Sequence, residues 1–211
     1  MTVSATRSEL LACRSRIVLA VQGRDLLSEK RVALMREFKR LSGSVIEALR
    51  VLERGAIDAD RVLVDAVVVE GLEALRSAAF AAGGEVPVTL RMRSVAGVPI
   101  VEVEHEATAR PRDQRGYSLA GTSARTDEVA ERFEAVLDGV LDLAALELSL
   151  RRLADEITRT TRRVNALEHV VVPRLEQERD FIALVLDERE AEERVRLMRA
   201  RGRAERERRA A

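Results

Sequence analysis

Two long tracts of the chain, one towards each end, carry apolar residues at alternating steps of three and four. In the first tract, eleven of thirteen such positions are apolar: Leu10, Cys13, Ile17, Ala20, Arg24, Leu27, Arg31, Leu34, Phe38, Leu41, Val45, Ala48 and Leu52. A spacing that averages 3.5 residues predicts helices that pair along a narrow seam and supercoil with a left hand.

The second tract repeats this spacing and then becomes more polar. Its first part consists of Leu143, Leu146, Leu150, Leu153, Ile157, Thr160, Val164, Leu167 and Val171. Its second part consists of Arg174, Glu178, Phe181, Val185, Glu188, Glu192 and Val195. Pro173 lies inside this tract, where it removes one intrahelical hydrogen bond, so we expect a bend near it in a helix that continues beyond.

These tracts and the region between them predict a mainly α fold. A capping box formed by Thr6 and Glu9 opens the first helix, and Gly55 is expected to close it. Between the tracts, alternating apolar residues on either side of the sequence Ser94-Val95-Ala96-Gly97 predict a β-hairpin. The expected parts are a helix over 6–54, a middle region over 55–126 and a helix over 127–205. Within the middle region we expect a helix at about 60–82, a hairpin at about 86–104 and a mobile loop over 106–123.

The first and last helices are expected to pair as a long antiparallel coiled coil, and their polar seam residues suggest a register. Facing residue numbers would add to about 205 or about 212. The first sum places Arg31 against Arg174, whereas the second places Arg24 against Glu188, so we predict 212. We also expect the hairpin to be dispensable for this pairing, and the seam from Leu137 to Leu153 to lack a partner on the first helix.

Composition excludes several classes of protein. Charged residues make up 34% of the chain and aromatic residues 2%, which suits paired helices better than a globular core. Lys plus Arg equal Asp plus Glu at 36 each, so net charge gives no argument for binding nucleic acid. No segment approaches the roughly 18 apolar residues that span a bilayer, so we expect a soluble, intracellular protein without direct membrane insertion.

The sequence offers no catalytic or metal-binding constellation. Gly121-Thr122-Ser123 lacks the second glycine and the lysine of a phosphate-binding loop, so we interpret it as a helix cap. His105 and His169 have no Cys or second His at ligand spacing. Carboxylates alternate with Arg along predicted helix faces, as in solvated ion-pair lattices. We therefore expect neither a cofactor nor an active site.

Several characteristic strings are spread along nearly the whole chain. The first helix contains Gly23-Arg24-Asp25-Leu26-Leu27, followed by Lys30-Arg31 and Leu34. The second contains Thr161-Arg162-Arg163-Val164-Asn165-Ala166-Leu167-Glu168, Val172-Pro173-Arg174-Leu175 and Leu186-Asp187-Glu188-Arg189-Glu190. The turn between them is Arg93-Ser94-Val95-Ala96-Gly97-Val98. Together these strings resemble the D subunit of the V-type/A-type ATP synthases, the central rotor shaft. The turn falls where that family has a similar one, although Ala96 stands where a larger residue is expected.

This resemblance implies a non-catalytic rotor protein that transmits torque between ATP chemistry and ion translocation, with protons as the expected ion. Its implied partners are the nucleotide-binding A and B subunits, the F subunit of the stalk and a membrane-ring adaptor, in a cytoplasmic complex peripheral to the membrane. From Arg194 onward, eight Arg against two Glu leave a charge of +6, which suits an acidic bore. The candidate contacts with the bore of the hexamer are Arg7, Arg14, Arg196, Arg199 and Arg201, and the candidate regulatory hairpin residues are Val95, Ala96, Gly97 and Val98.

An alternative class also combines antiparallel helices with a hairpin. A prefoldin-like chaperone protomer, or a general coiled-coil scaffold, would predict apolar helix tips that hold unfolded clients. The Arg-rich C-terminal segment argues against this alternative. Co-purification with large nucleotide-binding proteins would distinguish the two.

Overall fold

The computed structural model describes residues 4–105, 107–118 and 122–210. The chain forms two compact units. The terminal unit consists of Met1–Arg31 with Thr158–Ala211, and the middle unit consists of Val32–Ile157.

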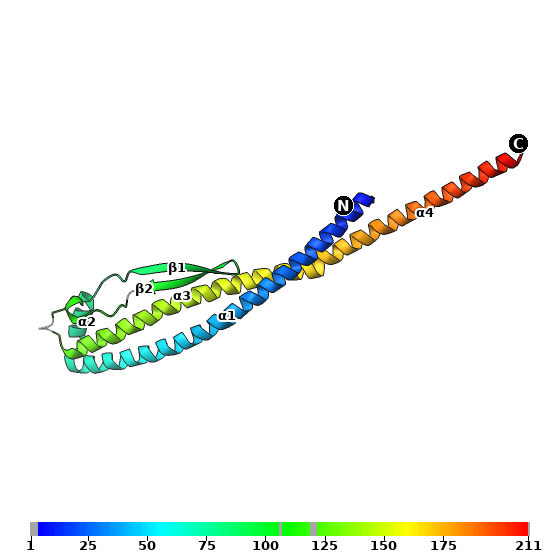
Figure 1. Ribbon diagram of the computed structural model, residues 1–211. Helices are drawn as coiled ribbons and strands as arrows, with labels where there is room; N and C mark the ends of the chain where they lie inside the picture. Colours follow the sequence, from blue (N-terminus) through cyan, green and yellow to red (C-terminus); the bar gives the residue numbers. More distant parts are fainter. Residues whose placement is uncertain (1–3, 106, 119–121, 211) are drawn as a thin grey trace. The chain divides into compact units, whose positions relative to one another are not determined.

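The described elements are mainly helical, as expected. In chain order they are α1 (Arg7–Glu70), α2 (Leu72–Ala81), β1 (Val88–Val95), β2 (Val98–His105), the 3₁₀ turn η1 (Arg112–Gln114), α3 (Ala124–Ala166), the π-helical turn η2 (Leu167–Val171) and α4 (Val172–Ala210). The strands β1 and β2 form an antiparallel two-stranded sheet in which Val95 pairs with Val98 and Val88 with His105. In the middle unit this hairpin lies alongside α3 (Figure 1).

The seam of the first tract forms as predicted and continues further than expected. All thirteen of its positions are buried or half-buried. The predicted helix end at 54 is wrong, because α1 runs through Gly55 and buries Ala59 and Ala66 in the same spacing. Packing against α3 outweighs the low helix propensity of one glycine, which costs about 1 kcal/mol.

The helix predicted over about 60–82 is divided in two. Its first half belongs to α1, which ends at Glu70, and its second half is α2. Gly71 separates them with φ 86°, a conformation in which residues with a Cβ are disfavoured. The chain therefore turns at Gly71 instead of at Gly55.

The end of α1 is fastened to the start of α3. The Glu70 carboxylate accepts hydrogen bonds from the Ser123 hydroxyl and from Thr126 Oγ1, the latter at 2.6 Å. Several turns further along the two helices, Gly55 faces Val136 and Gly139 faces Leu52. The seam from Leu137 to Leu153 therefore has its partner on α1, and the expectation that it lacks one is wrong.

The predicted register is also wrong, because facing residue numbers add to neither 205 nor 212. In the middle unit the sum is 191 for Leu52 with Gly139 and 196 for Glu70 with Thr126. In the terminal unit Arg7 pairs with Glu190 at 2.5 Å, which gives 197. A shift by whole heptads places apolar positions opposite each other again, so polar seam pairs worth about 0.5–1 kcal/mol could not decide the register.

The irregularity expected near Pro173 takes the form of the π-helical turn η2. The backbone N–H of Val172 donates to the carbonyl oxygen of Leu167, five residues earlier. A π turn adds one residue to the helical repeat, so the buried face shifts by one position beyond it. Ile182 is fully buried in the terminal unit, whereas Phe181, assigned to the seam by spacing, is 55% exposed.

The hairpin belongs to the core of the middle unit, contrary to the expectation that it contributes nothing to the helix pair. Val98 and Ile100 are 5% and 2% exposed and pack with Leu34, Leu41 and Leu153. This arrangement places β2 against apolar residues of both α1 and α3. Deleting the hairpin would therefore expose part of the core.

Substituting the turn residue Ala96 should stabilise the hairpin. Ala96 has φ 49° and Gly97 φ 81°, so the first of the two central turn residues carries a Cβ in the left-handed region. Ala96→Gly is expected to relieve about 1 kcal/mol of backbone strain and raise the melting temperature. Ser94→Gly, at an exposed position within β1, is the matched control and should lower it. Equal melting temperatures for Ala96→Gly and the native chain would contradict this.

Candidate functional site

The candidate regulatory residues form the end of the hairpin, where two are exposed and two face the core. Ala96 and Gly97 are exposed, and Val98 is buried. Val95 is half-buried and packs against the same apolar cluster as Val98. The exposed part of the predicted regulatory segment is therefore confined to the two turn residues.

Polar contacts fix β2 on α3. The fully buried Ser149 hydroxyl accepts a hydrogen bond from the backbone N–H of Val101 and donates one to the carbonyl oxygen of the same residue, each at 2.9 Å. At the C-terminal end of the strand, His105 Nε2 lies 3.2 Å from Asp142 Oδ1 and Nδ1 lies 3.4 Å from Asp138 Oδ1. These contacts hold the strand at its middle and at its C-terminal end.

An ion-pair chain connects the hairpin to α1. The Arg93 guanidinium lies 3.3 Å from Glu37 on α1 and 3.2 Å from Glu102 on β2. Glu37 also accepts a hydrogen bond from Arg40 at 2.6 Å, which is the main reason that the pKa of Glu37 lies below its ordinary value. Glu37 therefore stays ionised and links both elements.

Hydrogen bonds and ion pairs attach the segment after the hairpin to α3. The Thr108 backbone N–H donates to Asp138 at 2.9 Å, and Arg115 lies 2.8 Å from Glu134. Tyr117 donates its hydroxyl to Asp127 at 2.8 Å. Burial, and then this hydrogen bond, raises the pKa of Tyr117. The described part of the predicted loop is thus attached to α3, whereas residues 106 and 119–121 lie outside the described residues.

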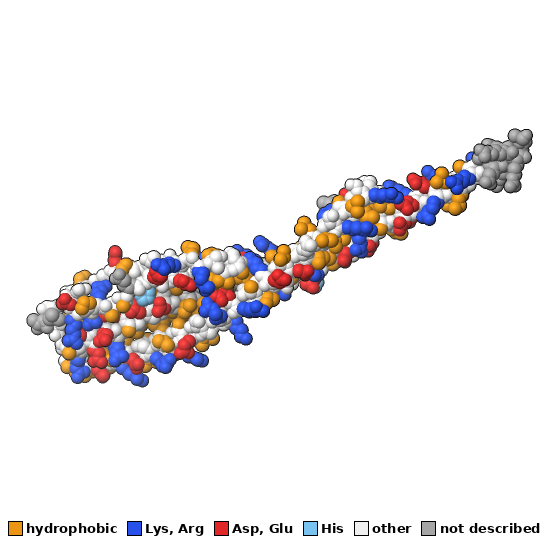
Figure 2. All heavy atoms as spheres, in the orientation of Figure 1, with side chains coloured by type: hydrophobic (Ala, Val, Ile, Leu, Met, Phe, Trp, Pro, Cys, Tyr) orange, Lys and Arg blue, Asp and Glu red, His pale blue; other side chains and the backbone are white. Residues whose placement is uncertain are grey.

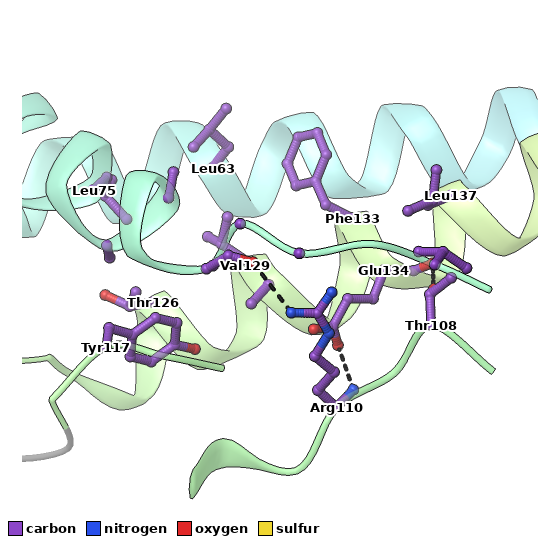
Figure 3. A pocket seen from close by; sticks show the side chains of 17 residues that line it. Leu63, Leu75, Thr108, Arg110, Tyr117, Thr126, Val129, Phe133, Glu134 and Leu137 are labelled. Atoms are coloured by element: carbon purple, nitrogen blue, oxygen red, sulfur yellow. Dashed lines mark hydrogen bonds between the residues drawn. The ribbon is translucent and has the colours of Figure 1, made fainter. Parts of the chain in front are cut away.

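A cavity of about 500 Å³ lies between α1, α2, α3 and the segments that connect them (Figure 3). Its walls are mostly apolar and include Leu63, Leu75 and Phe133. Arg110 and Glu134 bring charged groups to this wall. Sequence reasoning missed the cavity because its walls come from four separate parts of the chain.

Stability should depend on the Glu70 contacts in a pH-dependent way. Hydrogen bonds from Ser123 and then Thr126 lower the pKa of Glu70 in the folded chain. The ionised carboxylate therefore stabilises the fold above its unfolded pKa of about 4.3, and this stabilisation is lost as the pH falls through the folded pKa. Glu70→Gln should therefore destabilise the chain at pH 7, by about 1 kcal/mol, and have little effect at pH 3. Urea unfolding at both pH values, with the exposed Glu73→Gln as control, measures this difference. An effect of equal size at both pH values would refute the role of the charge.

In the terminal unit, α1 and α4 pack around Ala5, Cys13 and Ile182. The Cys13 thiol is fully buried and donates to the carbonyl oxygen of Leu175 at 3.3 Å. Arg189 donates to the carbonyl oxygen of Ala5 at 2.9 Å, close to the start of α1. Cys13 therefore has a packing role, in line with its place in the apolar spacing.

The five candidate bore contacts are exposed side chains of this unit, but their surroundings differ. Arg7 pairs with Glu190, and Arg196 lies 3.7 Å from Glu192. No ion pair with a described carboxylate is present at Arg14, Arg199 or Arg201. All five positions stay predictions of contact with a partner.

The visible surface is chemically mixed. Lys and Arg, Asp and Glu, and hydrophobic side chains are interspersed along the helices on the face shown (Figure 2). Within the described ranges, no group of three or more His, Cys, Asp or Glu side chains could hold a metal ion. None of the described helices contains a stretch long and apolar enough to cross a membrane.

Comparison with known proteins assigns the chain to a family. The family model for the D subunit of ATP synthase matches residues 9–202. The A-type ATP synthase D subunit from Methanoregula boonei is 36% identical over 202 residues, which cover 95% of this chain and 97% of that protein. The D subunits of Thermococcus kodakarensis and Methanopyrus kandleri are 38% and 40% identical over 95% and 97% of this chain, and these alignments cover 94% and 88% of those proteins. This membership decides against the prefoldin-like alternative. The chain therefore belongs to the D-subunit family of the A-type/V-type ATP synthases and is a non-catalytic component of the central stalk.

Proposed function

We propose that the chain transmits torque between nucleotide chemistry in the hexamer of A and B subunits and proton translocation at the membrane ring. The observation that carries this proposal is the antiparallel pairing of long helical segments within each unit. In the terminal unit Arg7 forms an ion pair with Glu190, and in the middle unit Thr126 donates a hydrogen bond to Glu70. Such pairing resists relative sliding, because each step of slippage would separate many apolar contacts at once. Family membership supports a stalk role.

The mixed surface charge supports movement against a stator. A rotor must pass several similar stator faces without being trapped at one of them. Large exposed apolar patches would favour fixed association, whereas alternating charges in water contribute little to any one contact. Charges of both signs are interspersed on the visible face, which is compatible with such movement (Figure 2).

The proposal places the two chain ends in the bore of the hexamer, with Arg14, Arg199 and Arg201 as the contacting residues. Their side chains are exposed, and no described carboxylate pairs with them. The F subunit and a membrane-ring adaptor are the further partners that the proposal assigns to the rest of the stalk.

Cross-linking tests this placement. A photoreactive residue at position 199 should attach the chain to an A or B subunit in the assembled complex, and ATP-driven proton transport should then stop. A photoreactive residue at the exposed position 76 on α2, outside the proposed contact, serves as the control. The proposal fails if position 199 attaches to neither of these partners, or if transport continues after complete cross-linking.

A further inference from the structure

The cavity of the middle unit combines apolar walls with a cation (Figure 3). Leu63 on α1, Leu75 on α2, and Phe133 and Leu137 on α3 supply its apolar surface. Its volume of about 500 Å³ lies within the range of pockets that hold small molecules. Phe133 and Leu137 are 44% and 40% exposed, so water reaches the cavity.

Among the described residues, two charged ones line the cavity, Arg110 and Glu134. The Glu134 carboxylate is paired with Arg115, and the neighbouring Asp127 carboxylate with Arg112 and Arg115. Arg115 lies 2.8 Å from Glu134, and Arg112 lies 3.1 Å from Asp127.

Arg110 supplies the cation of the cavity wall. Its guanidinium donates to the backbone carbonyl oxygen of Ala82 at 3.3 Å, and no described carboxylate lies within ion-pair distance of it. Its backbone N–H, in turn, donates to the Glu134 carboxylate at 3.2 Å, which holds Arg110 at the cavity wall. A bound anion would therefore give the Arg110 guanidinium a partner of opposite charge.

We propose that this cavity binds a small amphipathic carboxylate of the fatty-acid type. The alkyl chain lies against Leu63, Phe133 and Leu137, and the carboxylate lies on the Arg110 guanidinium. A planar guanidinium matches a carboxylate with two parallel hydrogen bonds, and the apolar walls exclude part of the water that would weaken them. Every group that this proposal uses belongs to the middle unit.

Tyrosine fluorescence provides a direct assay. Tyr117 lines the cavity and is the one tyrosine of a chain that has no tryptophan, so its emission reports on this place. The full chain is titrated below micelle concentrations with decanoate, with decyltrimethylammonium as a cation of the same chain length, and with acetate as the head group alone. A saturable one-site change is expected with decanoate only.

Three substitutions test the assignment of the groups. Arg110→Gln should weaken decanoate binding at least tenfold, and Arg110→Lys should weaken it less because the charge remains. Ala130→Leu, which fills the cavity from α3, should abolish binding. Arg76→Gln, at an exposed position on α2 outside the cavity, is the matched control and should bind like the native chain.

Several results would overturn the proposal. The first is a fluorescence change that does not saturate with decanoate. The second is equally tight binding of decyltrimethylammonium. The third is an affinity of Arg110→Gln for decanoate equal to that of the native chain. Helical circular dichroism confirms that each variant folds. If Arg110→Gln does not fold, native affinity in both Arg110→Lys and Ala130→Leu overturns the proposal equally.

Discussion

Replacing Ile100 with alanine is expected to lower the free energy of unfolding by about 2–4 kcal/mol. Ile100 is 2% exposed and belongs to the cluster that also contains Leu34 and Leu153. Truncation removes buried methyl groups and leaves a cavity between β2 and the helices. Urea unfolding followed by circular dichroism measures the loss.

Met92→Ala, on the other strand of the hairpin, is the matched control. Met92 is 69% exposed, so its truncation should change the free energy of unfolding by about 0.5 kcal/mol or less. Equal and small effects of the two substitutions would mean that the hairpin does not stabilise the helix pair. That result would restore the expectation, based on the apolar spacing alone, that the hairpin is dispensable.

Replacing Arg115 with methionine is expected to cost about 3–5 kcal/mol. Arg115 is 6% exposed and lies within ion-pair distance of Asp127 and Glu134, both largely buried. Removing the guanidinium leaves two carboxylates with less compensation in a place that water reaches poorly. The melting temperature should therefore fall by several degrees or more.

Arg112→Met is the matched control, because it removes an exposed cation where Arg115→Met removes a buried one. Arg112 also pairs with Asp127, but 66% of its side chain is exposed, so its loss should cost less than about 1 kcal/mol. Adding Glu134→Gln to Arg115→Met should recover part of the stability, because one of the uncompensated charges is then removed. A small effect of Arg115→Met, equal to that of Arg112→Met, would contradict the structural role of this cluster.

The apolar spacing alone predicted the seam of α1 and the first part of the seam on α3. Beyond Leu167 it was wrong for Val171, Arg174 and Phe181, because the π turn adds one residue to the repeat, whereas Val185 still packs in the core as predicted. Val172, Leu175, Ile182 and Leu186 then take the inward positions, and Phe181 turns outward. Pro173 indicated an irregularity in the helix, but a proline does not by itself show whether that irregularity is a bend or a π turn.

Register and helix length could not be read from the seam, because heptads repeat. Any shift by seven residues pairs apolar positions again. The register depends on where α1 ends, and this in turn depends on the single residue Gly71 and on the contacts of Glu70 with Ser123 and Thr126. Gly55 was the more conspicuous helix end in the sequence, but packing overrides it.

The candidate site was predictable only in part. The hairpin appears at Val88–His105, close to the range expected from its alternating residues. Its docking depends on Ser149, a polar residue on α3 that local sequence does not mark as a partner of Val101. The family strings gave the stalk role, which physical patterns alone only permitted, and the contacts with neighbouring proteins of the complex stay predictions.

Rotation of a bead attached to this chain tests torque transmission most directly. Ser94 is exposed at the hairpin and Cys13 is fully buried, so Ser94→Cys provides a specific attachment point. With the hexamer of A and B subunits fixed to a surface, ATP should turn the bead continuously in one direction. A bead that stays in place while the same complexes hydrolyse ATP would contradict the proposed role.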